Sequence, residues 1–110
     1  MSRVLAALLV GAQLTPNAPC IVGPGVALSW RQLDDAVVNA AAWLRAALDG
    51  APAGGPVAVL LDNGPAWAVI DLALIQLGRP SLPLPPFFSP EQRRHALADA
   101  GAALLVRAPT

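Results

Sequence analysis

Apolar side chains recur with helical spacing between residues 29 and 50, and this is the clearest pattern in the chain. Ser29 and Gln32 have the spacing of a capping box, in which the serine oxygen accepts a hydrogen bond from the Gln32 amide. Gly50 ends the pattern. The sequence therefore predicts an amphipathic helix after Ser29, with an apolar side formed by Trp30, Leu33, Val37, Ala40, Ala41, Leu44 and Leu48.

From Val57 onward, apolar runs of strand length alternate with helical patterns. The first run is apolar on both faces, which is typical of a parallel strand covered by helices on both sides. Gly78 is expected to end the next helix in the left-handed conformation, and Pro80 prevents its continuation. That helix is so apolar that we expect it to be buried nearly all round. The expected order is strand 57–61, helix 65–77, strand 81–84, a helix from the second capping box at Ser89 and Gln92 to Ala100, and strand 102–106.

This order predicts an α/β fold with an open, mainly parallel sheet (β-α-β-α-β) and helices on both faces. A helix from Ser2 to about Gln13 and a short hairpin around Gly23–Gly25 are expected to precede it. A signal peptide is the alternative for the first segment, but no A-x-A cleavage site follows it, so we favour the helix. We expect residues 1–110 to form a single α/β unit.

The composition leaves little charged surface for a chain of this size. Hydrophobic residues make up 55% and charged residues 13% of the 110 positions, against about 25% charged residues in typical soluble domains. A membrane span needs roughly 20 consecutive apolar residues, and the apolar stretches are interrupted by Asp34, Arg45, Asp62 and Asp71. We therefore expect a missing partner to cover the apolar faces, either the rest of a longer chain or another copy of this one.

Charge and cysteine content exclude several classes of partner and site. The net charge is zero, which argues against nucleic acid and anionic membranes as partners. Cys20 is the only cysteine, so an internal disulfide and a cysteine-based metal site are excluded, and we expect a cytoplasmic location.

Few residues qualify as carriers of chemistry. Asp62 is the best-placed polar residue, because it ends a strand at the edge where α/β sheets bind ligands. We favour the simpler interpretation that Asp62 and Asn63 cap the next helix. His95 is interpreted as a surface or packing histidine beside two arginines. Asp71 needs a partner or an exposed position, and the sequence does not identify which arginine could pair with it.

Motifs that bind phosphate or support nucleophilic catalysis are missing from the sequence. No G-x-G-x-x-G follows the first parallel strand, and without a lysine the chain cannot form a P-loop. Ser29 and Ser89 are better explained as helix caps than as nucleophiles. We therefore predict no catalytic, cofactor-binding or metal-binding residue in this chain.

Aromatic residues divide into an expected core group and an expected contact group. Trp30 and Trp67 fall on apolar helix faces and are expected in the core. Trp43 lies off the apolar stripe of its helix, and Phe87–Phe88 lies in a loop. These residues are expected to contact the missing partner.

Two segments resemble core motifs of the adenylate-forming enzymes, the AMP-binding family that includes acyl-CoA synthetases, luciferases and peptide-synthetase adenylation domains. Leu28–Leu33 resembles the first motif, L-(T/S)-(Y/W)-x-x-L, and Leu74–Pro85 resembles the second, L-x-x-G-x-x-x-x-P-L. Ser89–Ala102 and Asp62–Trp67 are similar to the segments that accompany these motifs. The resemblance covers nearly the whole chain in the family's order.

The resemblance implies the N-terminal subdomain of an enzyme that uses ATP to form an acyl-adenylate and passes the acyl group to a thiol. ATP, Mg²⁺ and coenzyme A are the cofactors that it implies for the whole enzyme. The family's phosphate loop, nucleotide-binding acid and catalytic lysine lie further along the chain, and none maps onto this sequence. The fragment itself is therefore expected to be inactive, and the acid substrate is not identified.

Two other classes of function remain open. A free-standing α/β interaction module would use the apolar surface as a genuine interface. A small nucleotide-binding protein is a weaker alternative, because the phosphate loop it would need is missing.

Overall fold

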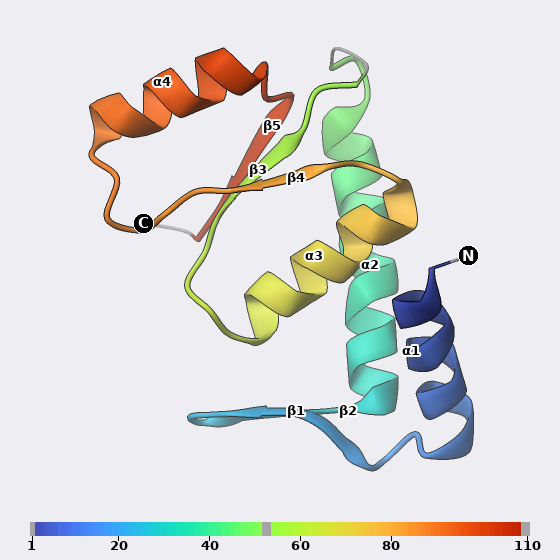
Figure 1. Ribbon diagram of the computed structural model, residues 1–110. Helices are drawn as coiled ribbons and strands as arrows, with labels where there is room; N and C mark the ends of the chain where they lie inside the picture. Colours follow the sequence, from blue (N-terminus) through green and yellow to red (C-terminus); the bar gives the residue numbers. More distant parts are fainter. Residues whose placement is uncertain (1, 52–53, 109–110) are drawn as a thin grey trace.

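The computed structural model describes residues 2–51 and 54–108. Its elements follow the predicted order of a helix, a hairpin, a long helix and then alternating strands and helices (Figure 1). They are α1 (Arg3–Leu14), β1 (Pro19–Gly23), β2 (Val26–Ser29), α2 (Trp30–Leu48), β3 (Val57–Leu60), α3 (Pro65–Leu77), β4 (Ser81–Pro83), α4 (Pro90–Ala100) and β5 (Leu104–Arg107).

The central sheet has three strands in the order β4-β3-β5, and both pairings are parallel. Val57 lies opposite Ser81 on one side and Leu104 on the other. The β1–β2 hairpin forms a separate antiparallel sheet. The open parallel sheet predicted from the apolar run at Val57 is therefore confirmed, with that run at its centre.

Helices lie on both faces of this sheet. The chain leaves β3 through α3 to reach β4 at one edge, and then returns through α4 to β5 at the opposite edge. Because right-handed crossovers in opposite directions place their helices on opposite faces, α3 and α4 are separated by the sheet. Figure 1 shows α4 across the sheet from α2 and α3, as the sequence predicts.

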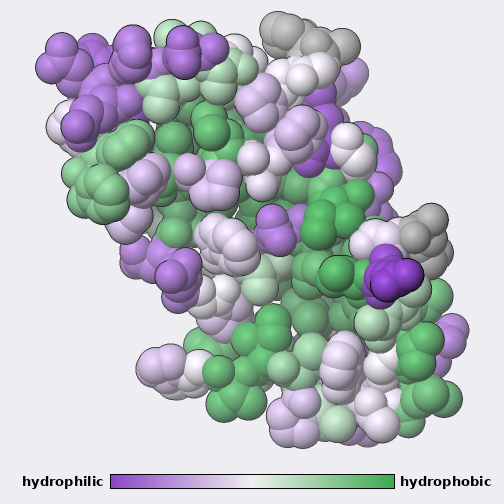
Figure 2. Space-filling view, in the orientation of Figure 1, coloured by the Kyte–Doolittle hydropathy of each residue, from purple (hydrophilic) through white to green (hydrophobic). Residues whose placement is uncertain are grey.

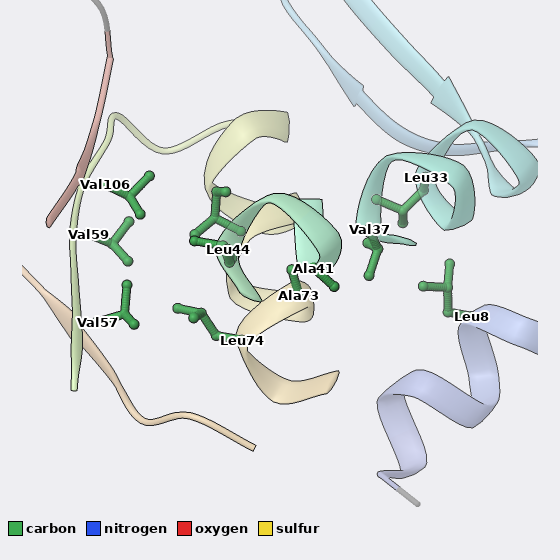
Figure 3. Close-up of a cluster of buried hydrophobic side chains, with 11 residues drawn as sticks. Leu8, Leu33, Val37, Ala41, Leu44, Val57, Val59, Ala73, Leu74 and Val106 are labelled. Carbon is green, nitrogen blue, oxygen red and sulfur yellow. The ribbon is translucent and has the colours of Figure 1, made fainter. Parts of the chain in front are cut away.

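The core lies between the sheet and the pair α2 and α3. Leu44 of α2 is 0% exposed and Leu74 of α3 is 1% exposed, and both face the side of the sheet that carries Val57, Val59 and Val106 (Figure 3). A second part of the cluster joins Leu33 and Val37 to Leu8 of α1. Helix α2 therefore contributes to both halves of the core.

Local capping signals are confirmed at several helix ends. The Ser29 hydroxyl oxygen accepts a hydrogen bond from the Gln32 amide at 3.1 Å, and the Gln32 side chain accepts one from the Ser29 amide at 2.9 Å. Ser89 and Gln92 form the same pair of bonds at the start of α4. Gly78 and Gly101 end α3 and α4 in the left-handed conformation, which glycine adopts without strain.

The predicted cap of α3 is wrong. Gly64, not Asn63, occupies the N-cap position, and no side chain caps this helix end. Pro65 begins the helix as expected, because its fixed φ suits the first turn. That start leaves the side-chain-free Gly64 at the cap, so Asp62 and Asn63 lie too far upstream and are exposed.

The expectation that α3 is buried nearly all round is also wrong. Only Ile70, Ala73 and Leu74 are buried in this helix, whereas Ile75 and Gln76 are exposed. The inner side of α3 packs on α2 and the sheet, and no described element covers its outer side.

Other differences between the predicted and observed elements are small shifts of strand ends, with Leu61 and Leu84 just outside β3 and β4. Part of the loop expected between Ala51 and Pro56 lies outside the described residues.

Gly11 is a sensitive packing position, because a methyl group there would overlap the Trp30 ring. We expect Gly11→Ala to lower the free energy of unfolding by about 1 kcal/mol. Overpacking costs about 1–3 kcal/mol, which exceeds the gain of up to ~1 kcal/mol in helix propensity. Gly23→Ala is the matched control, since a methyl group there meets no atom within 4 Å. If urea unfolding gave the two variants equal free energies of unfolding, the close packing of Gly11 against the Trp30 ring would be contradicted.

The two capping boxes are expected to differ in their effect on global stability. Ser29→Ala should lower the free energy of unfolding by about 1 kcal/mol, because α2 carries four buried core residues. Ser89→Ala should mainly speed amide exchange at the start of α4, which contains no buried residue. Hydrogen exchange and urea unfolding of both variants check this. Equal global losses would show that α4 belongs to the cooperative core.

Candidate functional site

A pocket of about 310 Å³ opens at the carboxyl edge of the parallel sheet. It brings together the ends of β3 and β5, the segment after β4, and the N-terminal half of α4. Its lining consists of Leu60, Leu61, Asp62, Pro86, Arg93, Arg107 and Ala108. Three of these side chains are charged and the others are apolar, so the pocket places charged groups beside an apolar wall.

The topology of the sheet creates this crevice. Strands β3 and β4 are neighbours, but the chain leaves β3 toward α3 on one face and leaves β4 toward α4 on the other. The two connections therefore diverge at the carboxyl ends of adjacent strands. Open α/β sheets bind ligands at such topological switch points.

The strand register places Arg107 in the pocket. Arg107 lies opposite Leu60 in the β3–β5 pairing, and Val106 lies opposite Val59. Since side chains alternate along a strand and Val59 and Val106 face α2 and α3, Leu60 and Arg107 face the α4 side. The last residue of β5 therefore presents a guanidinium group beside the end of β3.

Arg93 reaches the same pocket from α4. The second capping box fixes the start of this helix, and Arg93 follows Gln92 directly. The Arg93 Nε–H donates a hydrogen bond to the carbonyl oxygen of Phe88 at 3.3 Å, which ties the half-buried side chain to the segment before the helix. The remaining guanidinium N–H groups are left to bind other acceptors.

Sequence reasoning identified one of the three charged residues. Asp62 lies at the carboxyl edge as expected, but its assignment as a helix cap is wrong. Arg93 and Arg107 were not identified from the sequence. Arg107 directly follows the predicted strand 102–106, and Arg93 lies in the first turns of the helix capped by Ser89. The signal that could have found Arg107 is that parallel strands end at one common edge. Arg93 lies on a helix, where this signal does not apply.

Two guanidinium groups and one carboxylate give the pocket a formal charge of plus one. Arginine presents a planar fork of donors that matches phosphate and carboxylate oxygens. The pocket can therefore bind an anionic group. It offers no imidazole or thiol, so its own side chains supply binding more readily than proton transfer.

Other residues considered from the sequence take no part in this pocket. His95 is exposed on α4, which agrees with a surface histidine, and Asp71 is half-buried on α3. Burial raises the pKa of the half-buried Cys20 thiol, so the unreactive protonated form dominates at neutral pH.

The residues that the structure describes contain no group of three or more metal-ligating side chains. In the described part, no helix is long and apolar enough to cross a membrane.

Trp30 and Trp67 lie at the core as expected, whereas Phe88, which was expected to face a partner together with Phe87, is half-buried. Trp30 and Trp67 pack against the core cluster, whereas Trp43 is 55% exposed and Phe87 is 81% exposed. Figure 2 shows hydrophobic surface over the hairpin and α1, and hydrophilic surface over α4.

Comparison with known proteins places these features in a family. The family model described as "AMP-binding enzyme" matches residues 9–110. A feruloyl-CoA synthase from an Amycolatopsis species is 36% identical over 98 residues, which cover 89% of this chain and 20% of the relative. Surfactin synthase subunit 2 from Bacillus subtilis is 33% identical over 95 residues, which cover 86% of this chain and 3% of the relative. The chain therefore spans at most about a fifth of these two relatives.

Solved structures share the fold. VinN in complex with L-aspartate superposes with a TM-score of 0.84 over 99% of this chain and 28% of VinN, at 22% identity. O-succinylbenzoate coenzyme A synthetase from Bacillus subtilis, solved with ATP and magnesium, gives a TM-score of 0.75 at 26% identity over 89% of this chain and 26% of that enzyme. Sequence match and fold agree, and the chain belongs to the adenylate-forming, AMP-binding enzyme family, in which it matches the N-terminal domain of acyl-CoA synthetases.

Proposed function

We propose that this chain is the N-terminal part of an ATP-dependent acid–thiol ligase. In this reaction a carboxylate oxygen attacks the α-phosphorus of ATP, pyrophosphate leaves, and a thiol such as coenzyme A then displaces AMP from the acyl-adenylate. The observation that carries the proposal is the 36% identity to a feruloyl-CoA synthase over 98 residues. The likeness to a coenzyme A synthetase solved with its acyl-adenylate intermediate supports it.

Activation of an amino acid for peptide synthesis is the nearest alternative within the family. Surfactin synthase subunit 2 matches at 33% identity over a similar length. Both reactions begin with an acyl-adenylate and differ in the acid and in the thiol that receives it. We favour the coenzyme A ligase, because both the more similar sequence relative and the solved coenzyme A synthetase are of that type.

We further propose that the chain alone does not catalyse adenylation. The catalytic lysines and the phosphate loop that the family resemblance implies have no counterpart here, since the chain has no lysine. The charged residues of the carboxyl-edge pocket are Asp62, Arg93 and Arg107, which are groups suited to binding. Catalysis then requires the parts that this chain does not contain.

The partner that completes the unit is proposed to be the remainder of the enzyme. Large apolar side chains are exposed on several elements, including Val10 of α1, Val22 of β1, Trp43 of α2 and Ile75 of α3. Exposed apolar surface spread over so many elements is typical of a face that another part of the protein covers. A free-standing interaction module would use the same surface to bind a separate chain.

Adenylation should depend on the longer gene product. With ATP, Mg²⁺ and a panel of aromatic, aliphatic and amino acids, we expect the longer product to release pyrophosphate with at least one acid. The 110-residue chain should release none above the background rate. Pyrophosphate release by the short chain would overturn the proposed inactivity, and none from a folded longer product would contradict the proposed ligase.

Sedimentation distinguishes the two proposals, a fragment of an enzyme and a free-standing interaction module. We expect the isolated chain to associate without a defined stoichiometry, because exposed apolar side chains on α1, α2, α3 and the hairpin offer no single matched face. A discrete homodimer that stays intact on dilution would favour the module instead.

A further inference from the structure

We propose that the outer face of α4 binds a basic helical segment of another protein. The binding surface is a groove of about 510 Å³, the α4 groove, which is lined by Phe88, Glu91, Gln92, His95, Ala96 and Asp99. None of these residues lines the carboxyl-edge pocket, and the proposal does not rest on the ligase activity proposed above. It can therefore be tested on the 110-residue chain alone.

The charged residues of α4 are divided between two sides of the helix. Glu91, His95 and Asp99 follow one another at intervals of four residues, which places them in one row along the helix. Arg93 lies on the side that borders the carboxyl-edge pocket, and Arg94 does not line the α4 groove. The α4 groove therefore carries two carboxylates and no arginine, although the chain as a whole has no net charge.

The α4 groove is open to a partner. All six lining residues belong to α4 or to the segment directly before it, so no other described element takes part in the groove. Helix α4 contains no buried residue, and both carboxylates and the imidazole of the row are exposed. Figure 1 shows α4 at the periphery of the molecule, and Figure 2 shows hydrophilic surface over it. A positively charged partner would therefore meet an accessible face of complementary charge.

The spacing of the carboxylates fits a helix better than a single small cation. Glu91 and Asp99 are eight residues apart in α4, which corresponds to about 12 Å along the helix axis. One small cation does not reach both carboxylates across this distance, whereas a helix lying along α4 can present a basic side chain to each. The half-buried Ala96 lies between them, and its small side chain lets a second helix approach closely.

The aromatic end of the α4 groove favours arginine as the basic residue of the partner. Phe88 lines the groove, and its ring meets that of the exposed Phe87 edge to face, with 5.6 Å between the ring centroids. The Gln92 side chain at this end is held in place, because it accepts a hydrogen bond from the Ser89 amide at 2.8 Å. Guanidinium groups stack on aromatic rings and bind carboxylates through a planar fork of donors. A helical segment with two arginines about two turns apart and small apolar residues between them therefore complements the groove.

The test is a titration of the ¹⁵N-labelled chain, kept dilute enough to remain monomeric, with a helical peptide that carries two arginines two turns apart among alanines and leucines. We expect saturable shifts of the backbone amides along the α4 groove, and weaker binding at higher ionic strength. A peptide with glutamates in place of the two arginines should not bind. Shifts confined to the exposed apolar residues of α1 and α2 would indicate non-specific apolar contact and would overturn the proposal.

Asp99→Asn is the decisive variant. It should weaken binding of the arginine peptide roughly two- to fivefold, the range for the loss of one exposed ion pair. Because Asp99 lies in the last turn of α4, removing its negative charge favours the helix, so weaker binding would not result from unfolding of α4. Asp35→Asn on the exposed side of α2 is the matched control and should leave the affinity unchanged. Equal effects of the two substitutions, binding of the glutamate peptide, or shifts that do not saturate would contradict the proposal.

Discussion

The packing of α2 and α3 against one face of the parallel sheet is the constraint on which the rest of the structure depends. Leu44 and Leu74 fill the space between the helices and the valines of β3 and β5. Burying each such side chain contributes about 1.5–3 kcal/mol. Helix α2 also packs against α1 and the β1–β2 hairpin, and α3 leads directly into β4. Removing the contact of α2 and α3 with the sheet would therefore separate the sheet from α1 and from the hairpin.

Features with a local physical cause could be predicted from the sequence, whereas features set by distant neighbours could not. Ser29 and Ser89 cap helices because the partner amide lies three residues away in the same segment. The burial of α3 was overestimated, because apolar composition does not show which neighbour covers each side. The cap at Asn63 was wrong by one residue, since Pro65 fixed the start of the helix. In the site, Asp62 could be located at the sheet edge from the sequence, whereas the face of the sheet on which Arg107 lies depends on the β3–β5 register.

The molecule combines a charged pocket at the carboxyl edge of the sheet with apolar side chains that are exposed on several elements. The pocket with Asp62, Arg93 and Arg107 lies at the switch point between β3 and β4, on the side of the hydrophilic α4. Exposed apolar side chains lie on α1, on the hairpin, on α2 and on α3, and the exposed Phe87 lies just before α4.

We propose that this chain forms the N-terminal part of an adenylate-forming ligase. Reading the coding sequence beyond the codon for Thr110 tests it most directly. We expect an open reading frame that continues into a glycine-rich Ser/Thr loop ending in a lysine. A stop codon immediately after Thr110 would contradict it, and the apolar surface would then have to be explained by a separate partner chain.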